Sequence, residues 1–339
     1  MKNSLITLIF LFSSHLLFSQ NYVKTYYQLV NKAELEICNN NYSKAFKIYK
    51  KAFTKLEHPF YTDVKNAFVC GYFANKSEKN LKKYAAILTN KSNGFKDLID
   101  SAYRDERYYR IKEYAEKTEI TLDQYLVKTI DSLRKEDQKA RKKCVAYKPE
   151  CVADVMKADS TNRLMLVSLF EKYGNLTEEN AGFRSMSAFY LMGIHNQAWC
   201  MDPFHEYIKK QVMNGTFDAR IYAKTEDRKN TQPQCSYAKL NYGVGGFMIL
   251  DSVLFIDNLD VKNKQQIDSV RNSIFLEGMD NLITKTLFVF NHPEFEMGAD
   301  HFFFVNDPVE DRIWTQSMMA KIDNKEITNA IYFDLRKLK

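Results

Sequence analysis

Apolar and aromatic residues recur at helical spacing through the first third of the chain, from Tyr22 to about Lys117. Short polar breaks interrupt the pattern near residues 39–41, 75–77 and 90–94, as expected for turns between antiparallel helices. The 339 residues include only 11 glycines and 6 prolines, too few for a turn-rich β-sandwich. The sequence therefore predicts a mainly α fold, divided at this length into two or three domains.

The segment NYSKAFKIYKKAF, residues 41–53, places small and aromatic residues on one helical face: Tyr42, Ala45, Tyr49 and Ala52. This resembles the second helix of a tetratricopeptide repeat, in which alanines let two helices approach while aromatic rings fill the gap. Ala33 and Ala67 lie one repeat period of 34 residues apart, although Lys79 stands where the first unit has an alanine. Residues 21–117 are predicted to form tetratricopeptide-like helical hairpins, the alternative being an irregular array of helical hairpins. Either array offers a groove for a protein partner.

The first twenty residues, MKNSLITLIFLFSSHLLFSQ, contain one lysine, an apolar run from Leu5 to Phe12 and a later polar break. This is the layout of a secretory signal peptide cleaved beside Ser19 or Gln20, and the run is too short to span a bilayer. The alternatives are a buried N-terminal helix or a retained anchor. No later segment has the roughly 18 unbroken apolar residues of a membrane helix. We therefore expect an exported protein, periplasmic or secreted, with no transmembrane segment after cleavage.

Export into an oxidising compartment permits disulfides among the six cysteines. Cys144 and Cys151 bracket the segment VAYKPE, whose proline favours a turn that brings the two Cβ atoms together. They are the predicted disulfide, and Cys200 with Cys235 is a second candidate pair. The other two cysteines fall in helical patterns, where a buried free thiol is an equal alternative.

The charge excess is mild, because 49 lysines and arginines face 42 aspartates and glutamates, a net charge of +7. The densest basic patch, residues 134–143, also contains Glu136 and Asp137 and is typical of a solvated helix surface. No nucleic-acid partner is therefore predicted. The chain also lacks a nucleophile elbow, a P-loop, an H-E-x-x-H pair and a Cys-x-x-Cys pair. No cofactor is predicted either.

Ionisable residues fall on or beside apolar helical stripes in the second half of the chain: Asp137, Arg141, His195, Asp227 and Arg228. Asp137 extends an apolar stripe, where a carboxylate needs a partner, and Arg141 lies one turn further on. A histidine oriented by a carboxylate can act as a general base, and two guanidinium groups can hold an anionic substrate. The same five residues also fit a buried network that fixes helix packing, because buried charges must be paired.

Residues 131–285 carry the motifs EDQKAR, DSTNRLMLVSLFEKYG, GIHNQA, NGTFDARIYAKTEDR, QPQCSY and IDSVRNSIFLEGMDNLI, in that order. This order resembles the bacterial domain-of-unknown-function family 6624. The resemblance implies a helical domain and adds candidate positions, Asp159, Asn162, Gln234 and Tyr237, but no reaction, because the activity of the family is unassigned. The chain departs from the family at residues 238–240, where a Gly-Thr/Ser-Gln run is usual. If that run binds a ligand in relatives, the site here is altered or lost.

The segment FNHPEFEMGADH, residues 290–301, lies between the apolar runs TLFVF and HFFFV, which we predict as two strands of a hairpin. The imidazoles of His292 and His301, with neighbouring carboxylates, are candidate metal ligands. Their spacing fits no established metal motif, and a polar hairpin tip explains the same composition. No metal is therefore predicted.

The sequence thus predicts a signal peptide (1–20), tetratricopeptide-like hairpins (21–117), a helical domain (118–285) and an extension with a β-hairpin (286–339). The leading functional hypothesis is a noncatalytic binding or scaffolding protein with a protein partner on the N-terminal helical region. The alternative is an enzyme or small-molecule binder acting on an anionic substrate. Its catalytic candidates are His195, Asp137 and Asp227, and its ligand-binding candidates are Arg141, Arg228, Gln234 and Tyr237.

Overall fold

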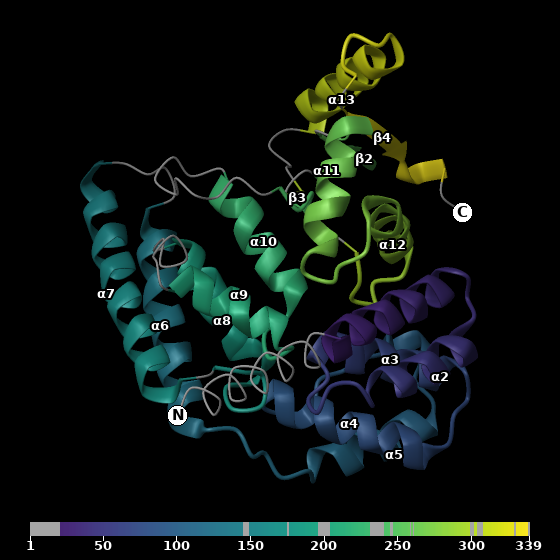
Figure 1. Ribbon diagram of the computed structural model, residues 1–339, viewed down its shortest axis with the longest axis vertical. Coiled ribbons are helices and arrows are strands. Elements are labelled where there is room, and N and C mark those ends of the chain that lie inside the picture. The colour runs from purple at the N-terminus through teal and green to yellow at the C-terminus, as the bar shows by residue number, and fades with distance from the viewer. Residues whose placement is uncertain are drawn as a thin grey trace, which may run out of the picture.

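The computed structural model describes residues 21–144, 149–174, 176–195, 204–230, 241–244, 247–257, 259, 261–298, 302–303, 308–328 and 330–337. Packed helices make up most of the molecule, and a small sheet lies near the C-terminal end of the chain (Figure 1). The prediction of a mainly helical fold with a small β-containing part is confirmed.

The N-terminal region is a row of helical hairpins. It comprises a helix over residues 21–38, α2 (Tyr42–Ala52), α3 (Tyr61–Phe73), α4 (Glu78–Ser92), the 3-10 helix η1 (Ser101–Tyr103) and α5 (Glu106–Glu116). The predicted breaks each contain an asparagine in the left-handed conformation, at Asn40, Asn75 and Asn93. Asparagine tolerates this conformation at a helix end better than most residues do. The stripe of Ala45, Tyr49 and Ala52 is fully buried, as the helical spacing predicts.

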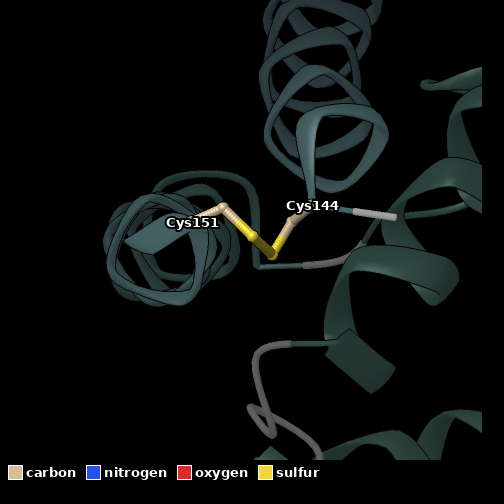
Figure 2. Close-up of a disulfide and its surroundings, with 2 residues drawn as sticks. All are labelled: Cys144 and Cys151. Atoms are coloured by element: carbon tan, nitrogen blue, oxygen red, sulfur yellow. A yellow bond between two sulfur atoms is a disulfide. The ribbon is translucent and has the colours of Figure 1, made fainter. Parts of the chain in front are cut away.

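The second half begins with two long helices, α6 (Gln124–Lys143) and α7 (Pro149–Tyr173), and α8 (Gly182–His195) packs against both. A disulfide joins Cys144 and Cys151 where α6 ends and α7 begins, with their Cα atoms 5.3 Å apart (Figure 2). The predicted disulfide is therefore present. Cys200 and Cys235 lie outside the described residues. Helices α9 (Phe204–Met213) and α10 (Ala219–Asn230) follow α8.

The sheet contains β1 (Phe247–Leu250), β2 (Val253–Ile256), β3 (Phe302–Phe303) and β4 (Ile331–Asp334), in the order β3-β1-β2-β4. Strand β2 is antiparallel to β1 and β4, and β3 is parallel to β1. Asp251 and Ser252 connect β1 to β2, and both have positive φ, as a two-residue hairpin turn requires. The remaining elements are α11 (Val261–Asn272), α12 (Met279–Asn291), α13 (Pro308–Asp323) and the 3-10 helix η3 (Leu335–Lys337).

The hairpin predicted between TLFVF and HFFFV is wrong. Residues 286–290 belong to helix α12, and Phe302–Phe303 form a strand that pairs with β1 instead. The buried residues Met279, Leu282, Ile283 and Thr286 recur at helical spacing, so a pattern longer than the five-residue run decides the conformation. Helix α12 also passes without a break through the predicted domain boundary at residue 285.

Buried ion pairs join the N-terminal helices to the second half. The ammonium group of Lys285 on α12 lies 2.7 Å from Glu34 and 2.6 Å from Glu277. Arg220 on α10 donates two hydrogen bonds to Asp63 on α3, at 2.7 and 3.0 Å. The side chains of Lys285, Glu34 and Asp63 are at most 3% exposed. Because such charges are costly to bury unpaired, these contacts fix the two halves against each other.

Glu178, in the loop between α7 and α8, forms another contact between the halves. Its carboxylate accepts the backbone N–H of Tyr61, in the first turn of α3, at 2.7 Å, and pairs with the buried ammonium group of Lys91 at 3.3 Å. The N-cap residue of α3, Phe60, provides no side-chain cap, so this distant carboxylate supplies an acceptor at the positive end of the helix. Burial raises the pKa of Glu178 to about 7, and the charge of Lys91 opposes that rise.

The raised pKa of Glu178 makes the folding stability depend on pH. Between the ordinary value of 4.5 and about 7, the folded protein keeps a proton that the unfolded chain releases. The associated stability is complete below pH 4.5 and is lost as the pH rises through 7. As the pH rises from 5 to 8, we expect the free energy of unfolding of the parent protein to fall by about 2 to 3 kcal/mol more than that of Glu178→Gln. Urea unfolding of both proteins at the two pH values measures this difference. Parallel pH profiles for the two proteins would contradict this expectation.

Candidate functional site

Helix α6 places Asp137 and Arg141 one turn apart at the end of an apolar stripe. Leu126 and Ile130 are fully buried on this stripe, and Asp137 continues it with a side chain that is 0% exposed. Arg141 keeps 18% of its side chain exposed, and its Nη2 atom lies 3.4 Å from Asp137 Oδ1. The predicted pairing of the two residues is therefore present, and it brings both charges to the side of α6 that faces α8.

His195, the last residue of α8, meets both residues of α6. Its Nδ1 atom lies 3.0 and 3.1 Å from the two carboxylate oxygens of Asp137 and 2.9 Å from Arg141 Nε. Gln138 donates a further hydrogen bond to Asp137 Oδ2 at 2.8 Å. The side chains of His195 and Arg141 are 22% and 18% exposed, so solvent reaches both of them, whereas Asp137 is fully buried.

Asp159 on α7 completes the group, which we name the histidine cluster: Asp137, Arg141, Asp159 and His195. Arg141 Nη2 donates a hydrogen bond to Asp159, whose side chain is 22% exposed. The sequence marks Asp159 only through the family resemblance, because the residue lies on a separate helix with no local pattern that links it to Arg141. Three helices thus contribute the two carboxylates, the guanidinium group and the imidazole.

The two carboxylates of the histidine cluster have opposite pKa shifts. Burial raises the pKa of Asp137, but the hydrogen bond and charge of His195, together with Arg141 and Gln138, outweigh it and hold the pKa below its ordinary value. Burial also raises the pKa of Asp159, and the charge of Arg141 only partly offsets this. Asp137 is therefore the carboxylate that stays ionised most readily, next to His195.

The cluster fixes the possible proton positions on His195. If Nδ1 carries the proton, it donates to the carboxylate of Asp137 and leaves Nε2 as a proton acceptor. If Nε2 carries the proton, Nδ1 instead accepts the Nε–H of Arg141. A carboxylate that orients a histidine is the arrangement of a general base, whereas the mutual pairing of all four groups also suits a structural network.

Within the described residues, Asp227 makes no contact with the four residues of the histidine cluster. Its two carboxylate oxygens accept the backbone N–H groups of Tyr242 and Val244, both at 2.6 Å. The carboxylate therefore ties the end of α10 to residues 242–244, where two short hydrogen bonds satisfy its charge. Among the described residues, no contact joins Asp227 to His195. The side chain of Arg228, and the whole of Gln234 and Tyr237, lie outside the described residues.

His292 has an apolar partner and a carboxylate partner. Its ring stacks on Phe288 with centroids 4.1 Å apart, and its Nδ1 atom lies 3.3 Å from Glu294. The carboxylate of Glu296 pairs with the ammonium group of Lys65 on α3, at a distance of 2.5 Å. Across the described part of the chain, no group of three or more histidine, cysteine, aspartate or glutamate residues is arranged to hold a metal ion. His301 lies outside the described residues.

Searches against protein-family models, curated proteins and solved structures found no match to this chain. The resemblance of residues 131–285 to domain-of-unknown-function family 6624 therefore stays a prediction. None of the helices in the described ranges is long and apolar enough to cross a membrane.

Proposed function

We propose that this protein is an exported, noncatalytic binding or scaffolding protein, and that its N-terminal helical region holds a protein partner. One observation carries the proposal: large tyrosine side chains are exposed on the last elements of the hairpin row. Tyr103, Tyr109 and Tyr114, on η1 and α5, are 63%, 57% and 46% exposed. The end of a helical array is normally polar, and tyrosine is a residue type that dominates binding interfaces.

One side of the hairpin row is already covered by residues 295 and 296 of the chain itself. The side chain of Asn66 on α3 exchanges two hydrogen bonds with the backbone of Glu296, each 2.8 Å long. Phe295 packs beside them against Tyr42 and Phe73, with ring centroids 5.8 and 6.4 Å away. The surface that remains exposed for a partner is therefore the outer side of α5, at the lower edge of the molecule in Figure 1.

The compartment and the rigidity of the molecule also support this proposal. The disulfide between Cys144 and Cys151 suits an oxidising compartment, as an exported protein meets. The α5 surface rests on α4, and buried ion pairs hold the hairpin row to the second half. A partner that binds preformed helices loses less conformational entropy than one that must order its target.

One specific observation favours the second candidate function, an enzyme or small-molecule binder with an anionic substrate. The carboxylate of Asp137, completely buried, lies 3.0 Å from Nδ1 of a partly exposed His195, and Arg141 lies beside both. Such a group can accept a proton and hold a negative charge at one place. The same contacts leave Arg141 shared between two carboxylates, which weakens its hold on a further anion.

A photo-crosslinking residue in place of Tyr109 tests the leading proposal in the cells that produce the protein. We expect it to capture one partner, which is then purified and titrated against the Tyr109→Ala, Tyr114→Ala double variant. Loss of two interface tyrosines is expected to weaken binding by about a hundredfold. The His195→Ala variant is expected to bind the partner as the parent protein does.

The matched control for crosslinking is Met156 on α7, which is 64% exposed on another part of the surface. Equal capture from positions 156 and 109, or equal affinity of the double variant, would contradict the proposed α5 interface. Loss of partner binding in His195→Ala alone would move the binding role to the histidine cluster and so favour the second candidate.

A further inference from the structure

The buried ion pairs between the two halves form one continuous network, which we name the junction network. Arg220 lies 2.8 Å from Asp218 and 3.6 Å from Glu34. Lys285 then joins Glu34 to Glu277, at 2.7 and 2.6 Å. The side chains of its members other than Arg220 are at most 10% exposed. The charged members are Glu34, Asp63, Asp218, Arg220, Arg271, Glu277 and Lys285.

The junction network contains more carboxylates than cations. Four carboxylates face three cations, so the fully ionised network carries one net negative charge. Within the described chain, no other lysine, arginine or histidine forms an ion pair with these four carboxylates. An uncompensated charge is costly in buried surroundings, and a carboxyl group avoids the cost by keeping its proton. The folded protein is therefore expected to hold one proton in this network.

Two of the four carboxylates have donors on both oxygens. Arg220 donates to both oxygens of Asp63, at 2.7 and 3.0 Å, and Tyr26 donates to one of them at 2.5 Å. Arg220 also donates to both oxygens of Asp218, at 3.0 and 2.8 Å. Burial raises the pKa of Asp63, while the charge and hydrogen bonds of Arg220 oppose the rise. A proton on either carboxylate would displace a donor that is already present.

Glu277 is the carboxylate of the network that stays ionised most readily. It lies 2.6 Å from Lys285 and 3.4 Å from Arg271. Burial would raise its pKa, but the charges of these two cations outweigh burial and lower the pKa to about 2. The proton of the network therefore does not reside on Glu277.

Glu34, on the N-terminal helix of residues 21–38, has an oxygen atom without a donor. Its Oε2 atom accepts from Lys285 at 2.7 Å, whereas its Oε1 atom is buried and has no hydrogen-bond partner. The amide oxygen of Asn31, three residues earlier on the same helix, is also buried without a partner. Residues at this spacing are neighbours on a helix face. A proton on Oε1 would add a donor where two acceptors lack one.

The groups around Glu34 favour its neutral form. Burial raises the pKa of Glu34, two cations oppose the rise, and two carboxylates add to it. Burial, and then the charge of Glu34, raise the pKa of Cys38 to about 12 and also raise that of Tyr49, so neither group ionises beside it at neutral pH. The two cations are Lys285 on α12 and Arg220 on α10, and the two carboxylates are Glu277, before α12, and Asp63 on α3.

We propose that the junction network is a pH-sensitive switch, in which Glu34 carries a proton while the two halves are packed together and releases it to solvent as the pH rises. Its release leaves one uncompensated negative charge among buried carboxylates, which weakens the packing of the N-terminal helix on α12. Because the pKa of Glu34 lies above its ordinary value of 4.5 in the folded protein, the associated stability is complete below pH 4.5. It is lost as the pH rises through the folded pKa. The switch goes beyond the partner surface on α5, so either proposal can fail without the other.

NMR titration of the side-chain carboxyl carbon of Glu34 tests the position of the proton. The Glu178→Gln protein is used, so that Glu178 does not contribute, and the signal is identified by its absence from the Glu178→Gln, Glu34→Gln double variant. We expect a titration midpoint above that of the same carbon in the urea-unfolded chain. Glu277→Gln is expected to lower this midpoint, because Lys285 then pairs with Glu34 alone. A midpoint in the folded protein at or below that of the unfolded chain would overturn the proposal.

Hydrogen exchange tests whether this proton controls the junction. Peptides from residues 21–38 and from α12 are followed by mass spectrometry in the Glu178→Gln protein, with each rate divided by the intrinsic exchange rate at that pH. From pH 5 to the folded pKa of Glu34, we expect the equilibrium constant for opening to rise about tenfold per pH unit, because opening releases one proton.

Two variants in the same Glu178→Gln background separate the switch from a general effect of pH. Glu34→Gln is expected to abolish the rise, because the amide resembles the protonated carboxyl group and cannot ionise. Glu106→Gln on α5, where the side chain is 96% exposed, is the matched control and is expected to keep the rise. An equal rise with and without Glu34→Gln would overturn the proposal.

Discussion

Lys285→Met is expected to lower the free energy of unfolding by about 3 to 5 kcal/mol, because it leaves two buried carboxylates without their nearest cation. The ammonium group of Lys285 is 2% exposed and lies within 2.7 Å of both Glu34 and Glu277. Burial alone would lower the pKa of Lys285, but these two carboxylates raise it, so the lysine stays charged in the folded protein. Methionine keeps much of the side-chain volume, so the measured loss reports on the charge. Urea unfolding followed by circular dichroism measures it.

Two comparisons make this prediction sharp. Lys264→Met removes a lysine whose side chain is 30% exposed and lies 3.0 and 3.1 Å from Asp268 and Asp280, and we expect it to cost less than about 1 kcal/mol. Adding Glu34→Gln to Lys285→Met is expected to restore part of the stability. It removes one of two buried carboxylates whose remaining cations lie farther away, Arg220 at 3.6 Å from Glu34 and Arg271 at 3.4 Å from Glu277. Equal losses for Lys285→Met and Lys264→Met would show that the buried network does not hold the halves together.

Gly298→Ala is expected to cost about 3 kcal/mol or more, because backbone strain and a steric clash act together. Gly298 has a φ of 90°, a region that residues with a side chain rarely adopt. A Cβ atom there would lie 2.8 Å from the backbone nitrogen and Cα of Thr286, in the middle of α12. A helix backbone cannot move aside as a flexible side chain can, so the segment that carries Phe295 and Glu296 across α3 must shift instead.

The control for this substitution is Gly174→Ala. Gly174 also has a positive φ, 66°, but a Cβ atom added there would have no neighbour within 4 Å. We expect this variant to lose only about 1 kcal/mol, the cost of the left-handed conformation. Thermal unfolding of the two variants and the parent protein separates the cost of the left-handed conformation from the cost of the steric clash. A loss in Gly298→Ala no larger than that in Gly174→Ala would contradict the close approach of this segment to α12.

Local sequence patterns predicted much of the helical structure and part of the histidine cluster. Asp137 and Arg141 pair because they lie one turn apart on a single helix, and the disulfide forms because a short loop brings Cys144 and Cys151 together. The prediction failed for residues 286–290, since five apolar residues fit a strand or a helix equally. It also missed the hairpin of β1 and β2, whose turn has Asp251 and Ser252 rather than glycine.

By itself the sequence determined the helix-forming periodicity, the positions of the turns and the partners of residues that lie within about one or two helical turns. Only the tertiary structure decided that Asp159 pairs with Arg141, that Asp227 accepts hydrogen bonds from the backbone of residues 242 and 244, and that Lys285 meets Glu34. The physical reason is distance along the chain: a local pattern shows that a buried charge needs a partner, but the packing of helices chooses which distant charge provides it.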